Sequence, residues 1–548
     1  MEKINEKIYS ILEKIALEMG AKDIDFKAER PKDSSHGDFA SNIALVLANK
    51  SHVVKSERYP SIGKTVMDYA NEIAGKVNDE VFDKVEAVSP GFINFYLSKK
   101  YLQTQISEII VKGDTYGTSN LGKDKKASVE FVSANPTGPL HIGNARGGPL
   151  GDTIANVLSK AGYNVTREYL HNDVGGQVIR LGESIYYELH PDQKSPTYEA
   201  QYKGEYIKDL AKAVEEVLQD KDMDLETERF MDEAGRVAVE MMLAEILKDC
   251  KDMGISYDKI RKESDLRHEV SKVLPKIKAS LKDQDGALWF APNDEFLKDR
   301  ETVVKKSDEN YTYFASDIAY HNEKMASNDL VVDILGSNHS GHVPRILAVI
   351  KALGYDTNNF RCVLYQYVRL KRNGEVVKMG KRFGTFITAK EVIDEVGKDA
   401  FRFFFLMSNT NTHMDFDLEL AKKQSSENPV FYVQYAYTRI ASIFAKSTLK
   451  NPEGGDLTLL KESEELVLAR KLLEFPYLVE EVAQNLEVNA FINYTMELST
   501  LFHKFYEAHQ VISKDSKLTQ ARLALLKATQ ITLKNTLDLL GVSAPEKM

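Results

Sequence analysis

Residues 129–152 read VEFVSANPTGPLHIGNARGGPLGD, and this stretch decides the fold of the chain. The segment from Ala127 to Ser133 is apolar and β-branched, which predicts a buried strand. Residues 134–139 cannot be helical, because each proline restricts the residue before it. A long helix is expected from Leu140 to about Ala161, where Gly162 stops it.

A second strand, predicted from Asn164 to Leu170, completes a strand–helix–strand unit with a right-handed crossover. Nucleotides bind at the carboxyl ends of such strands. Residues 180–280 are charged and helical, and we interpret them as an insertion into the sheet. Further strands are predicted at 302–305, 311–314, 330–335 and 363–369. The fold class is therefore α/β, with a Rossmann-type parallel-sheet core and helical insertions.

The segments on either side of this core have different patterns. Before it, the sequence predicts a small α+β domain with helices at 1–20, 39–50 and 62–77 and strands at 81–88 and 91–97. After it, the pattern is almost entirely helical, with a hairpin signal at Asn373-Gly374 preceding that region. A length of 548 residues suits three or four domains. We expect three domains, at 1–115, 116–425 and 426–548.

Composition narrows the class of protein. The net charge of −10 excludes a uniformly basic nucleic-acid coat but leaves room for a local basic groove. The two cysteines, Cys250 and Cys362, form no CxxC pair, so Cys₄ zinc sites and dithiol redox chemistry are not expected. No apolar run approaches the roughly 18 residues of a membrane span. We expect a cytoplasmic protein without a membrane partner.

The segment from Pro136 to Asn144 carries the clearest chemical signal. Its glycines let a phosphate approach the backbone, and the helix that follows supplies free N–H groups and a positive dipole end. His141 stands where the turn becomes helix, so its ring can donate to phosphate oxygens. The alternative is a glycine-rich turn that a histidine merely caps, and for a lone histidine that reading would prevail.

A second segment, VKMGKRFGT at 377–385, makes that alternative weaker. It holds three cations within five residues, Lys378, Lys381 and Arg382, among flanking glycines. Such a basic loop suits closure over a polyphosphate, because it brings positive charge to where negative charge develops. An isolated loop of this kind would more often be a solvated charged hairpin.

These two segments resemble the HIGH and KMSKS signatures of the class I aminoacyl-tRNA synthetases. Here they read His141-Ile142-Gly143-Asn144 and Lys378-Met379-Gly380-Lys381-Arg382, so Asn144, Gly380 and Arg382 depart from the signatures. Within the class, the chain resembles the arginyl-tRNA synthetases over about residues 36–548. The stretches that carry this resemblance are HGDFASNIALVLA (36–48), SPGFINFYL (89–97), residues 129–152, YFASDIAYH (313–321), DFDLELA (415–421), NPVFYVQYAYTRI (428–440) and LLGVSAPEKM (539–548).

The resemblance implies a ligase that uses ATP and Mg²⁺ to activate L-arginine and then transfers it to tRNA(Arg). It assigns the roles of transition-state cations to His141, Lys378 and Lys381. The implied ATP-binding residues are Pro136, Gly138, His141, Gly143, Asn144, His339, His342, Lys378, Met379 and Lys381. No protein nucleophile is needed, since the arginine carboxylate attacks the α-phosphorus and a tRNA ribose hydroxyl then takes the arginyl group.

Arginine itself constrains its pocket. The guanidinium is planar, with five N–H donors and no acceptor, so a selective site must present acceptors, preferably carboxylates. The candidates by resemblance are Glu130, Asn135, Tyr313, Asp317 and Asn338. Taken alone, Glu130 could be a solvated charge, Tyr313 a core residue and Asp317 a helix cap.

For RNA, the resemblance makes residues 426–548 an anticodon-binding domain and residues 1–115 a domain that touches the tRNA elbow. Tyr432, Tyr435 and Tyr437 cannot all lie on one side of a helix, so at least one is expected to be exposed. The further tRNA candidates by resemblance are Phe92, Asn94, Phe95 and Met548. A monomer is the default expectation, and arginine activation is expected to require tRNA.

Two other functions stay open at this point. One is a class I synthetase for another amino acid, such as glutamate or cysteine. A glutamate enzyme would need an Arg-rich pocket, and the metal site of a cysteine enzyme is not evident. The other is an RNA-binding relative without activity, against which the intact His141, Lys378 and Lys381 argue. We expect no metal site built by the protein, and His339 and His342 alone do not make one.

Overall fold

The computed structural model describes residues 4–31, 33–53, 65–194, 198–220, 227–298, 300–377, 387–449 and 454–548. Contacts between residues divide the chain into two compact units. The first comprises residues 1–113, 447–473 and 504–529, and the second comprises residues 114–446, 474–503 and 530–548.

A five-stranded parallel sheet is the centre of the second unit. Its strands, in spatial order, are β12 (Phe360–Tyr365), β11 (Leu330–Gly336), β5 (Lys126–Glu130), β6 (Asn164–His171) and β7 (Lys259–Lys262). The chain starts at β5, builds β6 and β7 on one side, and then crosses to build β11 and β12 on the other. The strand order therefore reverses between β5 and β11, and ligands of such sheets bind at that point.

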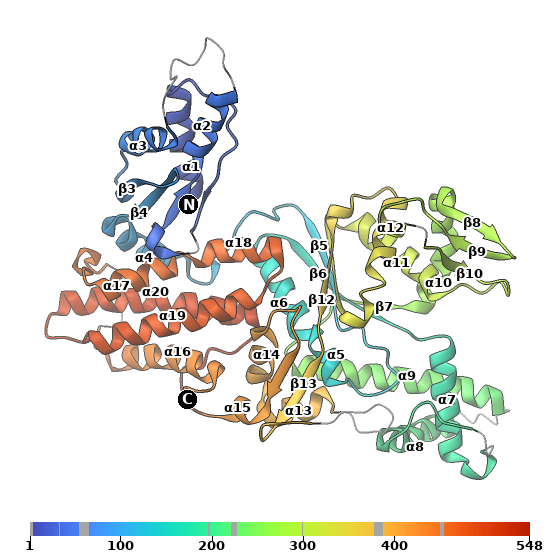
Figure 1. The fold of residues 1–548 in the computed structure, drawn as a ribbon. Helices are drawn as coiled ribbons and strands as arrows, with labels where there is room; N and C mark the ends of the chain where they lie inside the picture. Colours follow the sequence, from blue (N-terminus) through green and yellow to red (C-terminus); the bar gives the residue numbers. More distant parts are fainter. Residues whose placement is uncertain are drawn as a thin grey trace. The chain divides into compact units, whose positions relative to one another are not determined.

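Helices cover both faces of this sheet (Figure 1). On one face lies α6 (Gly147–Lys160), where a Cβ on Gly151 would stand only 2.1 Å from the Phe131 ring. Glycine at that position lets the helix approach the sheet closely. The other face is covered by α11 (Tyr313–Ser327) and α12 (Val343–Ala352), whose apolar residues pack on Val331 and Phe360. The expected α/β core is confirmed.

Several predicted elements differ in the structure. Strand β7 arises from within the predicted helical insertion and pairs with β6 at the sheet edge. The segment at 302–305 is a strand, β10, but it pairs antiparallel with β9 (Ala287–Phe290) beside β8 (Leu281–Gln284), outside the parallel sheet. Residues 311–314 are not a strand, because helix α11 begins at Tyr313.

The predicted long helix after the histidine turn is two helices, α5 (Ile142–Ala145) and α6. Arg146 lies at their junction, fully buried, and its guanidinium donates to the carbonyl oxygens of Gln366, Asn409 and Thr412 at 2.7–3.1 Å. These bonds tie the junction to the segment after β12. The predicted strand at 363–369 is likewise divided, between β12 and β13 (Val368–Arg372).

The insertion consists mainly of helices α7 (Gly176–Leu189), α8 (Glu205–Asp220), α9 (Thr227–Asp252) and α10 (Glu263–Val273). Helices α7 and α9 cross closely through paired glycines. A Cβ on Gly182 would lie 1.8 Å from the Met231 carbonyl oxygen, and one on Gly235 would lie 2.4 Å from that of Val178. Neither position can hold a side chain without separating the helices.

A small sheet and a group of helices follow β12. Strand β13 pairs with β14 (Glu375–Val376) through the expected Asn373-Gly374 turn, and parallel with β15 (Met414–Asp417). The helices of the second unit in this region are α13 (Ala389–Val396), α14 (Lys398–Met407), α15 (Leu418–Lys422), α16 (Pro429–Lys446) and α18 (Phe475–Asn485). Helices α19 (Asn489–Ala508) and α20 (Ser516–Leu540) contribute residues to both units. The expected helical C-terminal segment is confirmed.

The first unit contains an antiparallel sheet, ordered β1 (Ala28–Glu29), β2 (Phe39–Ser41), β4 (Phe92–Leu97) and β3 (Phe82–Val88). Its helices include α1 (Ile4–Glu18), α2 (Ile43–Val53), α3 (Val66–Lys76), α4 (Lys99–Lys112) and α17 (Ser463–Leu472). The predicted helix at 39–50 therefore begins late, because residues 39–41 are a strand. Arg470 of α17 pairs with buried Asp38 at 2.6 Å, which joins two distant parts of the chain within this unit.

Among the described residues, no helix is long and apolar enough to cross a membrane. Those same parts of the chain hold no group of three or more His, Cys, Asp or Glu side chains that could hold a metal ion.

Candidate active site

The sequence candidates gather at the carboxyl edge of the parallel sheet. Strand β5 runs into the loop that bears Asn135 and His141, and β11 runs into the turn η5 (Ser337–His339) that bears Asn338 and His339. Because parallel strands end at one edge, these two loops meet at the point where the strand order reverses. The sequence predicts a nucleotide site at this edge.

The loop after β5 is fixed by strained backbone and by hydrogen bonds. Val132 and Ser133 adopt positive φ angles of 67° and 39°, so the strand stops at Glu130 rather than at Ser133. Ser133 Oγ donates to Glu130 Oε1 at 2.9 Å and accepts from the Leu170 backbone N–H at 3.1 Å. Tyr169 OH donates to the Ala134 carbonyl at 2.7 Å. The loop is therefore held to the neighbouring strand β6.

His141 caps helix α5 with its ring. Its Nδ1 accepts a hydrogen bond from the Gly143 backbone N–H at 2.9 Å, and a Cβ on Gly143 would lie 3.0 Å from the same atom. A nitrogen that accepts carries no proton, so in the neutral ring the proton is on Nε2. His141 therefore does cap the helix, as the alternative interpretation predicts. The same hydrogen bond leaves Nε2 as the nitrogen that can donate.

The segment that follows the basic loop lies against this turn. Ile142 N–H donates to the Ile387 carbonyl at 3.1 Å, and Ala389 N–H donates to the Leu140 carbonyl at 2.8 Å. His141 and Thr388 form an antiparallel bridge between these bonds. The predicted ATP residues Lys378, Met379 and Lys381 lie outside the described residues. The described residue that follows them, Ile387, is hydrogen-bonded beside His141.

Other predicted ATP residues belong to the same loops. Pro136 is buried, and a Cβ on Gly138 would lie 3.2 Å from the hydroxyl of Tyr206 on α8. The Asn144 backbone carbonyl accepts from Tyr365 OH at 3.4 Å. Burial lowers the pKa of His339, and neighbouring His342 lowers it further.

Two arginine candidates lie on the first turns of α11. The Tyr313 ring is exposed, and its hydroxyl accepts from Asn172 Nδ2 at 3.3 Å. One turn later, the half-buried Asp317 carboxylate pairs with His342 Nε2 at 3.1 Å. Asn135 is exposed and donates to Gln177 Oε1 at 2.9 Å. Asp317 is not the helix cap that the sequence alone allows, because Thr312 holds the N-cap position of α11.

Sequence reasoning missed Glu263, the first residue of α10. Burial raises the pKa of this carboxyl to about 7; Arg267 opposes the rise, and Asp317 and Asp173 add to it. The electrostatic effect of Asp317 shows that two carboxyl groups face the same region. A Cβ on Gly175 would lie 3.2 Å from Tyr313 OH and 3.3 Å from Arg267 Nη2, so these residues surround one glycine. The sequence signal that could have identified Glu263 is its position directly after the end of a strand, β7.

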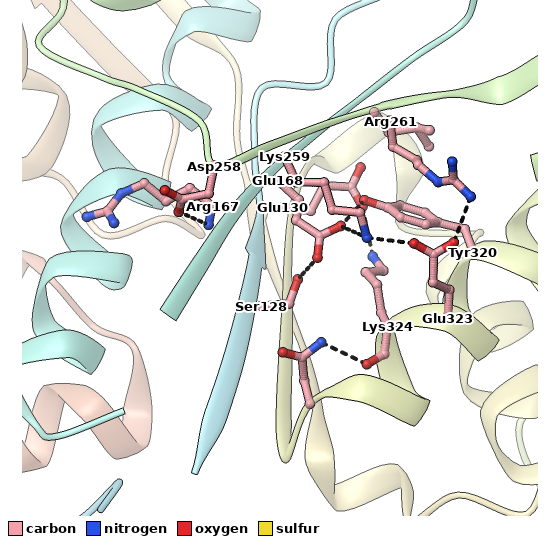
Figure 2. Close-up of polar contacts among 12 residues, drawn as sticks. Ser128, Glu130, Arg167, Glu168, Asp258, Lys259, Arg261, Tyr320, Glu323 and Lys324 are labelled. Carbon is pink, nitrogen blue, oxygen red and sulfur yellow. Dashed lines mark hydrogen bonds and ion pairs between the residues drawn. The ribbon is translucent and has the colours of Figure 1, made fainter. Parts of the chain in front are cut away.

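The second half of α11 carries a buried ionic cluster, made of Lys324, Glu130, Asp333 and His321. Figure 2 labels Lys324 and Glu130 of this cluster. Lys324 Nζ lies 2.8 Å from Glu130 Oε2 and 2.6 Å from Asp333 Oδ1, with none of its side chain exposed. His321 Nε2 lies 2.9 Å from Asp333 Oδ2, and Nδ1 lies 2.8 Å from the Asp317 carbonyl oxygen. The cluster joins α11 to both strands that flank the reversal of strand order.

The protonation of this cluster follows from its pairing. Burial disfavours the charge on Asp333, yet Lys324 and His321 outweigh burial and lower its pKa to about 2. Burial raises the pKa of Glu130, with Lys324 acting against the rise. For Lys324, burial acts to lower the pKa, but the two carboxylates raise it above the usual range. Glu130, predicted to lie near the substrate arginine, is thus committed to an internal lysine.

A neighbouring set of polar contacts extends the cluster along β6 (Figure 2). Glu168 accepts from Ser128 Oγ at 2.8 Å and from Tyr320 OH at 2.9 Å. Lys259 and Arg261 of β7 pair with Glu323 of α11 at 2.6 and 2.9 Å. Helix α11 is therefore held to strands β5, β6, β7 and β11 by side chains on its sheet-facing side.

The tRNA candidates differ in exposure. In the first unit, Phe92 is exposed, whereas Asn94 and Phe95 are buried in strand β4. Buried side chains of a sheet core cannot meet RNA without leaving it, so contact through Asn94 and Phe95 has no support in this fold. In the second unit, Tyr435 and Met548 are exposed, Tyr437 is buried, and Tyr432 OH donates to Thr500 Oγ1 at 3.2 Å. Tyr435 is therefore the exposed tyrosine that the spacing of the three tyrosines predicts.

Comparison with known protein families gives three matches that together span almost the whole chain. Residues 105–426 match the family described as tRNA synthetases class I (R), catalytic domain. Residues 2–97 match the arginyl tRNA synthetase N terminal domain, and residues 433–548 match the DALR anticodon binding domain.

Individual relatives agree with these matches. The chain is 40% identical to the arginine–tRNA ligase of Carboxydothermus hydrogenoformans over 566 residues, covering 100% of this chain and 99% of that one. It is 39% identical to that of Staphylococcus aureus over 539 residues, covering 96% and 95%. A solved arginyl-tRNA synthetase from Campylobacter jejuni has a TM-score of 0.74 at 31% identity, covering 82% of this chain and all of that one.

A more distant solved structure, a methionyl-tRNA synthetase from Mycobacterium tuberculosis, shares the fold alone, with a TM-score of 0.55 at 12% identity over 77% of this chain and 92% of that one. The parallel sheet, the histidine turn and the catalytic-domain match define a class I aminoacyl-tRNA synthetase. Within that class, the chain belongs to the arginyl-tRNA synthetase family, and its function is arginine–tRNA ligation.

Proposed function

We propose that arginine activation takes place at the carboxyl edge of the parallel sheet, with ATP over the histidine turn and arginine over the start of α11. The observation that carries this proposal is the backbone pairing of residues 140–142 with residues 387–389. This pairing holds the described residues that follow the basic segment, from Ile387 onward, beside His141. It supports the proposal that the cations of the segment and the helix N-terminus serve one polyphosphate.

The chemistry needs positioning and charge rather than a nucleophile from the protein. The carboxylate of arginine attacks the α-phosphorus of ATP, and pyrophosphate leaves. A ribose hydroxyl of tRNA(Arg), the 2′-hydroxyl by analogy with the class, then takes the arginyl group. His141 donates from Nε2, while Lys381, assisted by Lys378, opposes the developing charge. Mg²⁺ enters with ATP, because it binds mainly to substrate phosphates in such sites.

For arginine, we propose a pocket formed by Asp317, Glu263, Tyr313 and Asn135. Two carboxylates and two further acceptors suit a planar group that only donates. Asn338, which lies in the adjacent loop, is a further acceptor. We do not include Glu130 among the direct ligands, because it pairs at 2.8 Å with Lys324, whose side chain is fully buried, whereas the pair of Glu263 with the partly exposed Arg267 is longer, at 3.3 Å.

For tRNA, we propose that residues 426–548 bind the anticodon loop, with exposed Tyr435 as a stacking platform. In the domain at 1–115, exposed Phe92 is the remaining candidate for contact with the tRNA elbow. We also propose that the enzyme acts as a monomer in the cytoplasm and that arginine activation requires tRNA.

ATP–pyrophosphate exchange tests this assignment. Exchange is expected with arginine, only when tRNA is present, and not with glutamate or cysteine. Exchange driven by another amino acid would contradict the arginine pocket. Exchange without tRNA would contradict only the tRNA requirement.

Substitution of the basic loop tests the role of its central cation. Lys381→Ala is expected to slow adenylate formation by roughly 10²- to 10³-fold, with little change in arginine binding. Single-turnover kinetics measures the first quantity and equilibrium binding the second. Lys390→Ala is the matched control, because Lys390 stands nearby on α13 and pairs with Asp394. Equal losses of rate and of binding in Lys381→Ala would refute a role in the transition state.

A further inference from the structure

The Asp317 carboxylate has a partner within the protein. His342, which directly precedes α12, places Nε2 at 3.1 Å from Asp317 Oδ2, and both side chains are about a quarter exposed (26% and 25%). Asp317 belongs to α11, so the pair joins the loop proposed for ATP to the helix proposed for arginine. A guanidinium that reaches Asp317 must therefore meet His342 at the same carboxylate.

The groups around His342 favour its cationic form. The hydrogen bond to Asp317 raises the pKa of the His342 imidazole, and the negative charge of Asp333 on β11 raises it further. Burial and the positive charge of Arg345 on α12 act in the opposite direction. The pKa of His339 of η5 is lowered by burial and by His342, and Asp317 acts against this lowering. Glu263 of α10 and Asp317 also act on each other electrostatically, since Asp317 raises the pKa of Glu263. In the substrate-free protein, the His342 ring thus pairs with a partly exposed carboxylate, and this pairing favours the charged form of the ring.

We propose that His342 holds the guanidinium position on Asp317, and that arginine displaces the imidazolium, which gives up its Nε2 proton to solvent. The inference deepens the proposed arginine pocket and rests on it. One pair, carboxylate–imidazolium, is broken, and one, carboxylate–guanidinium, is made. The charge of the pocket is unchanged, because the cation that arrives replaces the proton that leaves.

Proton release follows from like-charge repulsion. A guanidinium on Asp317 would stand beside a protonated ring, which disfavours the charge on that ring. Arginine binding is therefore linked to deprotonation, so the apparent affinity rises with pH as long as His342 is protonated in the free protein. The slope approaches tenfold per pH unit and flattens once the free ring is neutral. Glu263 should also release a proton when arginine binds, because the guanidinium cation favours the ionised form of its carboxyl group.

Calorimetric titration of the full-length protein with L-arginine tests the inference, in buffers of different ionisation enthalpy between about pH 5.5 and 8.5. The wild type is compared with His342→Gln, which keeps a neutral donor for Asp317 but cannot be protonated. At pH 6 we expect His342→Gln to bind arginine severalfold more tightly than the wild type and to release up to one proton fewer per arginine bound. His339→Gln, the matched control on the adjacent turn, should release as many protons as the wild type.

The outcomes separate the inference from the pocket on which it rests. Equal proton release and equal pH dependence in His342→Gln and the wild type would overturn the role of His342. Unchanged arginine affinity in Asp317→Asn would instead contradict the pocket. The Glu263→Gln variant should lack the proton release that comes from Glu263. It should retain the proton release that comes from His342, which His342→Gln abolishes. If His342→Gln does not fold, His342→Asn tests the same loss of charge, and thermal melts establish which variant is native.

Discussion

The two halves of helix α11 pair their carboxylates with different kinds of cation. In the buried half, Lys324 holds Glu130 and Asp333 with no exposed side chain of its own. In the N-terminal half, Asp317 is partly open to solvent and pairs with His342. A lysine between two carboxylates keeps its charge permanently. A histidine can lose its charge near neutral pH, so its pair can be exchanged for another cation.

With arginine bound at Asp317 as proposed, the difference would separate stability from binding within one helix. Burying charges is costly, and the cost is offset only where the partner never leaves. A binding carboxylate needs the opposite property, since its internal partner must yield to substrate. Each of the following substitutions affects one half of the helix. Each should change either the free energy of unfolding or the affinity for arginine, but not both.

The largest effect is expected from Lys324→Met. Removing one partner of a buried ion pair costs about 3–5 kcal/mol of unfolding free energy, because the carboxylates then lack a cation. The pKa values of Glu130 and Asp333 would rise above their unfolded values, so the folded state would bind more protons than the unfolded state. The free energy of unfolding should therefore fall as pH rises, and the loss should be larger at pH 8 than at pH 5. Urea unfolding at both pH values measures this.

Lys259→Met serves as the control for that experiment. Lys259 also pairs with two carboxylates, Glu323 and Glu168, but its side chain is 37% exposed. Pairs of this kind contribute about 1 kcal/mol or less. A similar loss in the two variants would show that burial does not set the difference between the halves of α11.

A smaller effect, on binding alone, is expected from Asp317→Asn. Loss of a charge-assisted pair with the guanidinium should weaken arginine binding by about 1.5–3 kcal/mol, or roughly 10- to 100-fold. The melting temperature should change little, because the site is partly exposed. Equilibrium arginine binding and thermal melts measure both. Asp265→Asn, at an exposed position of α10, is the control and should bind arginine as the wild type does.

The smallest effect is expected from Tyr313→Phe. This change removes one hydroxyl, which accepts from Asn172 at 3.3 Å, and keeps the ring. Because the Tyr313 hydroxyl is uncharged and the residue is exposed to water, its loss should cost about 0.5–1.5 kcal/mol, so the KM for arginine should rise about 2- to 10-fold with the KM for ATP unchanged. Steady-state kinetics with each substrate varied in turn would show this. Equal changes in both KM values would place Tyr313 outside the arginine pocket.

The sequence was sufficient for the central strands but not for the sheet edge. Strand β5 is an apolar, β-branched run, and the proline-rich loop marks its end, so local pattern and fold agree. Strand β7 reads Lys-Ile-Arg-Lys from Lys259 to Lys262. As an edge strand it keeps charged residues in contact with Glu323 and solvent, so no apolar run marks it. Residues 311–314 are aromatic and β-prone, yet packing made Tyr313 the start of a helix.

Candidate site residues could be proposed from the sequence only where they lie close together along the chain. His141, Gly143 and the basic segment form short motifs that can be read directly. Lys324 and Glu130 are 194 residues apart, and only the sheet register brings Glu130 opposite Asp333. Glu263 likewise enters the proposed pocket only through the fold, because β7 ends directly before it. The spacing of Asp317, His321 and Lys324 indicates one helix face once the helix is known, but not what that face meets.

The pairing of Lys324 also has a chemical consequence. The proposed reaction passes through a mixed anhydride of arginine and AMP, and such anhydrides acylate neutral amines. An amine attacks only through its lone pair, which a proton occupies in an ammonium ion. Glu130 and Asp333 raise the pKa of Lys324 and keep it protonated. The ion pairs that fasten α11 to the sheet thus also leave this lysine without the lone pair that acylation requires.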